Sequence, residues 1–189
     1  MSDLSLGTIM LIEDEAADSL LISRAFEQVG IQNPIQAISH GDTELAYLEG
    51  IGEYQNRLRS PLPILILLDL KLPGMMGLQL LKWIRTRKDL RLIPVVVLTT
   101  SRDDIDVKSA YEAGANSYLL KPADRKDVFR IIQLIQSYWL KHNVPAPLVI
   151  RTHTQQSSKS GFSHPPSADD EWSCGTVTIE ASTERLCYY

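Results

Sequence analysis

The sequence predicts a doubly wound α/β fold, in which helices cover both faces of a parallel sheet. Short apolar runs alternate with segments whose apolar residues recur at helical spacing, and the alternation repeats five times by about residue 142. The strongest runs contain no polar residue, as expected of strands that are buried on both faces. Alternating strands and helices favour a parallel sheet, and such sheets bind ligands at the carboxyl ends of their strands.

Five apolar runs predict the strands. TIMLI at 8–12 stops at three acidic residues, and PIQAIS at 34–39 is a weaker strand. The run at 64–68 is fully apolar and leads directly into an aspartate. PVVVL at 94–98 is too short and too β-branched for a buried helix, and residues 117–120 complete the set.

Five amphipathic segments predict the helices. Their apolar faces lie over 22–29, 45–48, 77–84, 105–113 and 128–139. Gly30 and Gly114 suit helix ends, whereas Asp42, Asp103 or the neighbouring Asp104, and Asp124 suit helix starts. A long connection with turn residues follows the second helix.

The chain changes character after residue 142. We expect one compact domain over 6–142, followed over 143–189 by a linker and a low-complexity tail. The tail is polar, rich in Ser and Pro and without periodicity, so we expect it to be disordered. TVTIEAS at 176–182 alternates like a strand, but a single strand cannot bury itself.

Composition excludes several classes of protein. The net charge of −4 gives no electrostatic case for broad nucleic-acid binding. No apolar run approaches the length of a membrane span, and the N-terminus lacks the pattern of a signal peptide. The two cysteines, Cys174 and Cys187, build neither a disulfide framework nor a zinc site. We therefore expect a cytoplasmic protein.

Three acidic residues should meet at one edge of the sheet. Glu13 and Asp14 end the first strand and Asp69 ends the third, and in this fold those two strand ends are neighbours. Adjacent carboxylates raise one another's pKa unless a cation lies among them, and a hard divalent ion, with Mg²⁺ as the best choice, suits oxygen ligands. The alternative is that such acids are solvated strand ends or helix caps, the role we assign to Glu15 and Asp18.

The other two strand ends add complementary chemistry. The fourth strand ends in Thr99-Thr100-Ser101, whose hydroxyls can donate to an anion. The fifth leads into Lys121-Pro122, where a cis bond is left open. Alone, Lys121 would more often be a solvated surface lysine. Together with the acids, it indicates a site for a phosphoryl group and a metal ion.

Four segments in order, LIEDE, LLDLKLPGMMG, VVVLTTS and GANSYLLKP, resemble the receiver domain of two-component response regulators over roughly residues 6–142. The resemblance implies a flavodoxin-like sheet with strand order 2-1-3-4-5. It also implies that a histidine kinase phosphorylates Asp69, giving an acyl phosphate. Asp14, Asp69 and the backbone carbonyl of Lys71 would ligate Mg²⁺, with Glu13 acting through water.

The resemblance further implies how phosphorylation is sensed. Lys121 would pair with the phosphoryl group, and Thr99 would turn its hydroxyl toward a phosphoryl oxygen. Tyr118 would then swing inward and change the surface around the fourth helix, fifth strand and fifth helix. Two residues depart from the commonest pattern: Thr100 is bulkier than usual, and Lys71 adds a cation whose effect on hydrolysis has no predictable sign.

Three other interpretations compete with this one. Phosphatases that resemble haloacid dehalogenases need an acid two residues after the nucleophile, where this chain has Lys71. We therefore expect no enzyme beyond catalysis of its own phosphorylation and dephosphorylation. A degenerate receiver that docks partners without phosphorylation conflicts with the intact Asp14, Asp69, Thr99 and Lys121. A partner-binding tail is permitted by the composition but not supported by it.

The output should be a protein contact. About forty-seven residues follow position 142, without helical periodicity or a basic face, which predicts a single-domain regulator with no DNA-binding domain. The connection AYLEGIGEYQNRLRSPLPILILLDL and the ending IQSYWLKH are similar to small regulators paired with cyanobacterial phytochromes. This implies a light-regulated kinase and a homodimer. Tyr138 and Trp139 are either interface anchors or ordinary packing residues.

Overall fold

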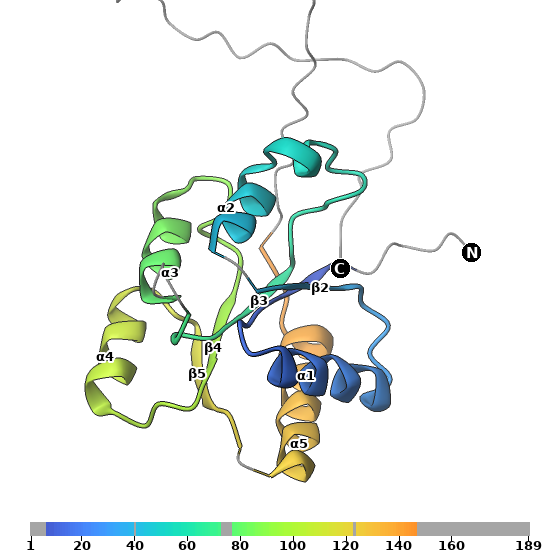
Figure 1. The fold of residues 1–189 in the computed structure, drawn as a ribbon, viewed down its shortest axis with the longest axis vertical. Coiled ribbons are helices and arrows are strands. Elements are labelled where there is room, and N and C mark those ends of the chain that lie inside the picture. Colours follow the sequence, from blue (N-terminus) through green and yellow to red (C-terminus); the bar gives the residue numbers. More distant parts are fainter. Residues whose placement is uncertain (1–6, 40, 73–76, 123, 147–189) are drawn as a thin grey trace, which may run out of the picture. The chain divides into compact units, whose positions relative to one another are not determined.

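The computed structural model describes residues 7–39, 41–72, 77–122 and 124–146. Within them, five parallel strands form one sheet in the order β2-β1-β3-β4-β5, which confirms the expected topology (Figure 1). The strands are β1 (Ile9–Ile12), β2 (Ile35–Ile38), β3 (Leu65–Leu68), β4 (Val95–Thr99) and β5 (Ser117–Leu120). Each bound lies within one residue of its predicted position.

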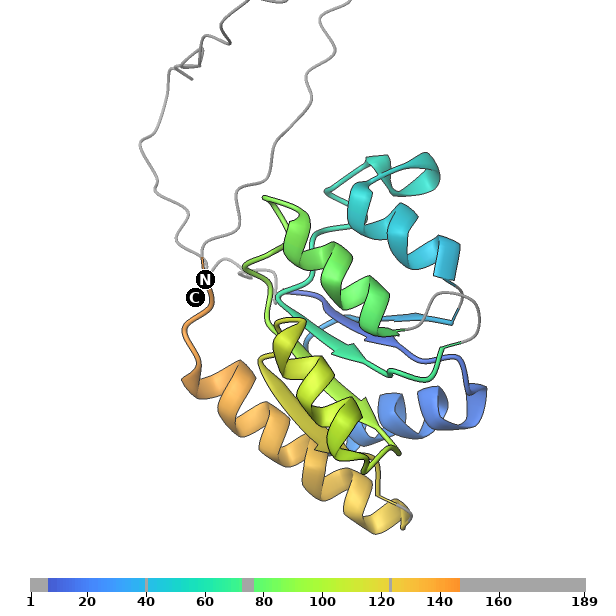
Figure 2. The same ribbon diagram turned by 90° about the vertical axis from the view of Figure 1, so that its left-hand side faces the viewer.

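Helices cover both faces of the sheet. They are α1 (Ala16–Val29), α2 (Gly41–Glu49), α3 (Gly77–Thr86), α4 (Asp104–Glu112) and α5 (Arg125–Ile135), with a short 3₁₀ helix, η1 (Gly52–Gln55), after α2. A π-helical segment, η2 (Gln136–His142), continues α5. Helices α1 and α5 pack side by side on one face, and α2 and α3 cover the other with α4 beside α3 (Figures 1 and 2).

The central strands β1, β3 and β4 are buried on both sides because each contributes side chains to two apolar clusters. In β1, Ile9 and Leu11 pack toward α1 and α5, whereas Met10 and Ile12 pack toward α2 and α3. This alternation follows from the two-residue period of a strand. All four side chains are buried, as the apolar runs predicted.

Several predicted local features are present. The Asp124 side chain accepts a hydrogen bond from the backbone N–H of Lys126 (3.0 Å) at the start of α5. Gly30 ends α1 with φ +82°, a backbone conformation that favours glycine. The Lys121–Pro122 bond is trans, as are all peptide bonds between described residues, so the cis alternative is wrong.

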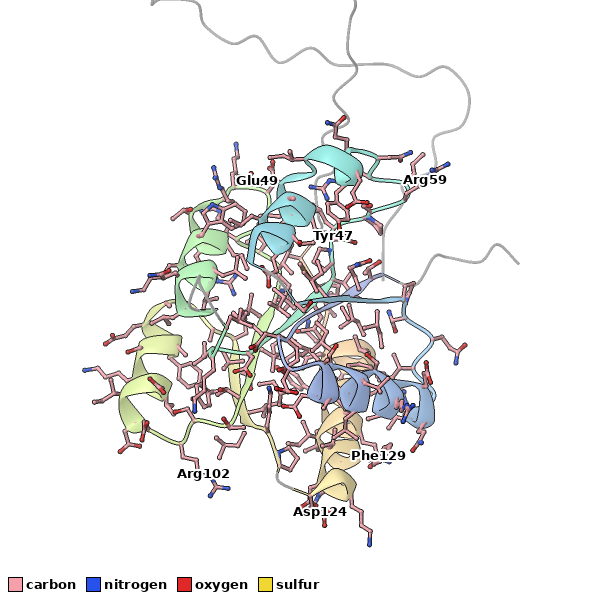
Figure 3. The ribbon with its side chains drawn as sticks, in the orientation of Figure 1. Tyr47, Glu49, Arg59, Arg102, Asp124 and Phe129 are labelled. Carbon is pink, nitrogen blue, oxygen red and sulfur yellow. The ribbon has the colours of Figure 1, made fainter. Side chains whose placement is uncertain are left out.

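The connection after α2 folds back onto that helix (Figure 3). The Arg57 guanidinium donates to the carbonyl oxygens of Tyr47 and Leu48 (both 2.7 Å), which a helix C-terminus leaves without partners. The buried Tyr47 hydroxyl donates to the carbonyl oxygen of Pro61 (2.8 Å). The long connection is therefore an ordered cap on α2.

The predicted tail lies outside the described residues after position 146, so the disorder expected of it stays a prediction. Near the end of the described chain, Trp139 packs against the α1/α5 cluster, whereas Tyr138 is exposed. Of the two aromatic residues, Trp139 is thus a packing residue. No helix among residues 7–146, apart from the undescribed positions, is long and apolar enough to cross a membrane.

Candidate functional site

The site begins where strands β1, β3, β4 and β5 end. Ile12 lies opposite Leu68 in the pairing of β1 with β3, so Glu13 and Asp69 leave the sheet at the same level. The backbone N–H of Asp69 donates to the carbonyl oxygen of Ile12 (3.0 Å), and the backbone N–H of Lys121 donates to the carbonyl oxygen of Thr99 (2.7 Å). These bonds continue the sheet ladder beyond the strands and fix where the charged side chains start.

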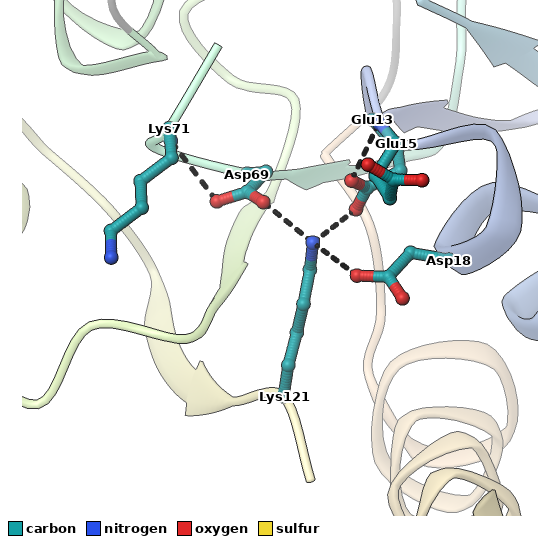
Figure 4. Close-up of polar contacts among 6 residues, drawn as sticks. All are labelled: Glu13, Glu15, Asp18, Asp69, Lys71 and Lys121. Carbon is teal, nitrogen blue, oxygen red and sulfur yellow. Dashed lines mark hydrogen bonds and ion pairs between the residues drawn. The ribbon is translucent and has the colours of Figure 1, made fainter. Parts of the chain in front are cut away.

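The Lys121 ammonium lies at the centre of three carboxylates (Figure 4). Its Nζ is 2.5 Å from Asp69 Oδ2, 2.5 Å from Glu13 Oε2 and 3.1 Å from Asp18 Oδ2. An ammonium has three N–H donors, and the three carboxylates match that number. The Lys121 side chain is only 8% exposed, so it is no ordinary surface lysine.

Burial and charge act against each other in this cluster. Burial raises the pKa of Glu13, and the contact with Lys121 only partly offsets that effect. Burial would lower the pKa of Lys121, but hydrogen bonds to Asp69 and Glu13 outweigh it and hold the pKa above the usual value. Lys121 is therefore cationic at neutral pH and compensates the buried acids.

The donor set fits a divalent metal ion. Glu13, Asp14 and Asp69 each offer a carboxylate oxygen, and these three oxygens lie within 4.8 Å of one another. Asp14 is exposed, whereas the other two are buried. An all-oxygen set of this kind suits a hard cation.

Lys71 contributes its backbone rather than its charge. Its N–H donates to Asp69 Oδ1 (3.1 Å), while its side chain points away from the carboxylate and is exposed (Figure 4). Both Asp69 oxygens are thus held, Oδ1 by Lys71 and Oδ2 by Lys121.

Hydroxyl groups line the other side of the same edge. The Thr99 side chain is fully buried at the end of β4, yet its Oγ1 has no hydrogen-bond partner among the described residues. Leaving a buried hydroxyl unpaired costs about 1–3 kcal/mol, which asks for an explanation. Thr100, in contrast, is exposed.

The loop after β4 connects this side of the site to Tyr118. The Ser101 hydroxyl donates to Asp106 Oδ2 (2.5 Å), and the Tyr118 hydroxyl donates to the Ser101 carbonyl oxygen (3.1 Å). Burial, together with the negative charge of Asp106, raises the pKa of Tyr118. The Tyr118 hydroxyl is therefore hydrogen-bonded to the loop that begins directly after Thr99.

The structure brings Glu13, Asp14, Asp69 and Lys121 together, as predicted, and corrects the assignment of one further acid. Asp18 was expected to be a solvated helix residue, but it pairs with Lys121, so that expectation is wrong. Its position in the first turn of α1, directly after a strand end that carries acids, was the available signal. The Ser101–Asp106 bond was also missed, because a five-residue spacing across a loop has no sequence signature.

Comparison with known proteins agrees with this geometry. The model of the response regulator receiver domain family matches residues 9–133. Response regulator Rcp1 of Synechocystis sp. is 43% identical over 133 residues, which span 70% of this chain and 88% of Rcp1. The probable methanogenesis regulatory protein FilR2 of Methanothrix harundinacea is 43% identical over 138 residues, 71% of this chain and 84% of FilR2.

Solved structures give the same result. The Mn²⁺-bound form of Rcp1 superposes with a TM-score of 0.69 at 40% identity, covering 75% of this chain and 99% of Rcp1. The phosphorylated cyanobacterial phytochrome response regulator RcpA gives a TM-score of 0.70 at 34% identity, with the same coverage of 75% and 99%. The chain therefore belongs to the response regulator receiver domain family and is a response regulator homologous to Rcp1.

Proposed function

We propose that this response regulator accepts a phosphoryl group on Asp69 from the phosphohistidine of a sensor histidine kinase, in a Mg²⁺-dependent reaction. The observation that carries the proposal is the environment of Asp69. Its carboxylate is buried, held by Lys71 and Lys121, and close to the acidic oxygens of Glu13 and Asp14. A carboxylate oriented in this way is suited to act as a nucleophile.

In the proposed transfer, an Asp69 oxygen forms a bond to phosphorus while the bond between phosphorus and the histidine nitrogen breaks. The products are an acyl phosphate and a neutral histidine. A bound Mg²⁺ would supply positive charge beside the phosphoryl oxygens. Asp14, Asp69 and the backbone carbonyl of Lys71 would hold the ion. Glu13 would act through water, since its two oxygens already accept from Lys121 and from the backbone N–H of Glu15.

Two further side chains would bind the phosphoryl group. Lys121 already donates to Asp69 Oδ2, so an oxygen of a group attached there comes within its reach. The Thr99 hydroxyl would donate to a second phosphoryl oxygen and so gain the partner it lacks. The cost of the unpaired hydroxyl is then recovered when the protein is phosphorylated.

The switch would act through the β4–α4 loop. The Tyr118 hydroxyl donates to the carbonyl oxygen of Ser101, so a shift of Thr99 toward the phosphoryl group would also move the hydrogen-bond acceptor of the tyrosine. The affected surface comprises α4, β5 and α5, which we propose as the contact surface for a downstream protein. Tyr118 already touches this loop, so we propose that phosphorylation stabilises an existing contact rather than creating a new one.

The partner kinase is proposed from the relatives. RcpA is a phytochrome response regulator, and its likeness to this chain favours a phytochrome-type kinase in the cytoplasm. We also propose a homodimer, with the exposed Tyr138 as a candidate contact residue. An experiment with the full chain and a purified phytochrome-type kinase would test the first of these assignments.

Labelling with acetyl phosphate tests the central assignment without a kinase. We expect the protein to gain one phosphoryl group in the presence of Mg²⁺ and to gain none when the ion is chelated. Asp69→Asn should abolish labelling, whereas Asp127→Asn, a change of the same type at an exposed position in α5, should not affect it. Undiminished labelling of Asp69→Asn would refute the proposal.

A further inference from the structure

Asp18 differs from the other two acids that surround Lys121. It comes from the first turn of α1 rather than from a strand end, and its side chain is 39% exposed against 2% for Glu13 and 7% for Asp69. Its distance to the ammonium, 3.1 Å, is also the longest of the three. The cluster thus has two buried partners and one that water reaches.

The proposed function gives Lys121 an additional task. A phosphoryl group presents several oxygens where Asp69 presents one, and the ammonium binds it most strongly by donating more than one N–H. All three N–H groups face carboxylates in this structure. A second donor can therefore come only from the contact with Glu13 or from the contact with Asp18.

Burial decides which contact is given up. Separating Lys121 from Glu13 would leave a buried carboxylate without its cation, which is strongly unfavourable. Asp18 is partly exposed, so water can solvate its carboxylate when it loses the lysine. Breaking an ion pair with an exposed acid also costs little free energy. A cavity of about 230 Å³ between α1 and α5 is lined by Asp18, Lys121 and Thr100 among others, so the Asp18 side chain has room to turn.

We propose that Asp18 is a positioning residue that holds one N–H of Lys121 before phosphorylation and competes with the phosphoryl group for it. The inference rests on the proposed function of Asp69. Asp18 is not among the three acids whose oxygens converge as a metal site in the described chain, so its effect is exerted through Lys121. Removing its charge should strengthen binding of a phosphoryl mimic.

The test is the affinity of the full chain for beryllofluoride in the presence of Mg²⁺. We expect Asp18→Asn to bind on the order of two- to fivefold more tightly than the wild type, the change expected from losing a partly exposed ion pair. Asp18→Glu retains a carboxylate and should restore the wild-type affinity. The matched control is Glu15→Gln, which removes the same charge from an exposed side chain nearby and should leave the affinity unchanged.

A spectroscopic measurement separates positioning from a structural role. The NMR signal of the Lys121 ammonium should shift in Asp18→Asn and not in Glu15→Gln, while thermal unfolding of both variants remains cooperative. If Asp18→Asn binds beryllofluoride with equal or weaker affinity than the wild type, or if Glu15→Gln gains as much affinity, this inference is wrong but the proposed function still stands. A wild-type protein that does not bind beryllofluoride would overturn the proposed function, and this inference with it.

Discussion

The two sides of the carboxyl edge differ in how completely their polar groups are paired. On the side of β1 and β3, Glu13 and Asp69 are buried and share the ammonium of Lys121. On the side of β4, the equally buried Thr99 hydroxyl has no partner among the described residues. The buried charges are therefore paired within the protein, whereas the Thr99 hydroxyl can still donate to an acceptor that another group supplies.

The largest effect should follow from breaking the charged side. Lys121→Met leaves buried carboxylates without their cation and should lower the free energy of unfolding by about 3–5 kcal/mol in the absence of metal. Urea denaturation with a chelator present measures the loss. The matched control is Lys108→Met, because Lys108 and Glu112 form an ion pair at 3.7 Å that is 75% and 67% exposed. The control should lose at most about 0.5 kcal/mol, and a similarly small loss for Lys121→Met would contradict the account.

Adding a divalent ion should stabilise the charged side further. At about a hundred times its dissociation constant, Mg²⁺ should raise the free energy of unfolding by about 2.7 kcal/mol, because the ion binds only the folded arrangement. Asp14→Asn should lose most of this gain. Asp104→Asn, a change at an exposed acid in the first turn of α4, should keep it. Equal gains in both variants would place the ion elsewhere.

Removing the unpaired Thr99 hydroxyl should not lower the stability of the protein, unlike the loss of Lys121. Thr99→Val keeps the shape of the side chain and deletes a polar group without a partner, so we expect unchanged stability or a gain on the order of 1 kcal/mol. Ser101→Ala deletes a hydroxyl that is hydrogen-bonded to Asp106 and should cost about 1 kcal/mol. Chemical denaturation of both variants compares the paired with the unpaired hydroxyl. A comparable loss for Thr99→Val would mean that its hydroxyl has a partner.

The effect of Tyr118 on stability depends on pH. Burial raises its pKa above the usual value of 10.0, so the folded state holds the phenolic proton more tightly than the unfolded chain does. The stability that this proton contributes is complete below pH 10.0 and is lost as the pH rises through the folded-state pKa. Tyr118→Phe should lower the free energy of unfolding by roughly 0.5–1.5 kcal/mol at neutral pH. The difference from the wild type should shrink as the pH rises through the folded-state pKa of Tyr118. A difference that grows with pH would refute the assignment.

The fold and the main site could be predicted because both depend on repeated local patterns. Apolar runs placed the strands, and the acids, hydroxyls and lysine at the strand ends predicted a convergent site. The order of the strands came from the family resemblance, since local patterns do not specify which strands pair.

Features that depend on a single side chain meeting a distant partner could not be predicted. Asp18 lies in the first turn of α1 and Lys121 follows β5, 103 positions later in the sequence, so their ion pair depends on how closely these two elements approach at the edge of the sheet. The capping of α2 by Arg57 likewise depends on a loop folding back onto a helix, which has no periodic signal. These contacts require the tertiary structure.

The most direct test of the central claim is to locate the phosphoryl group itself. Wild-type protein labelled by acetyl phosphate and Mg²⁺ can be digested, and the modified peptide identified by mass spectrometry. We expect a single modified peptide, the one that contains Asp69, with the modification on that residue. A phosphoryl group on Asp14, on any other residue, or on none would contradict the assignment of Asp69 as the phosphoacceptor.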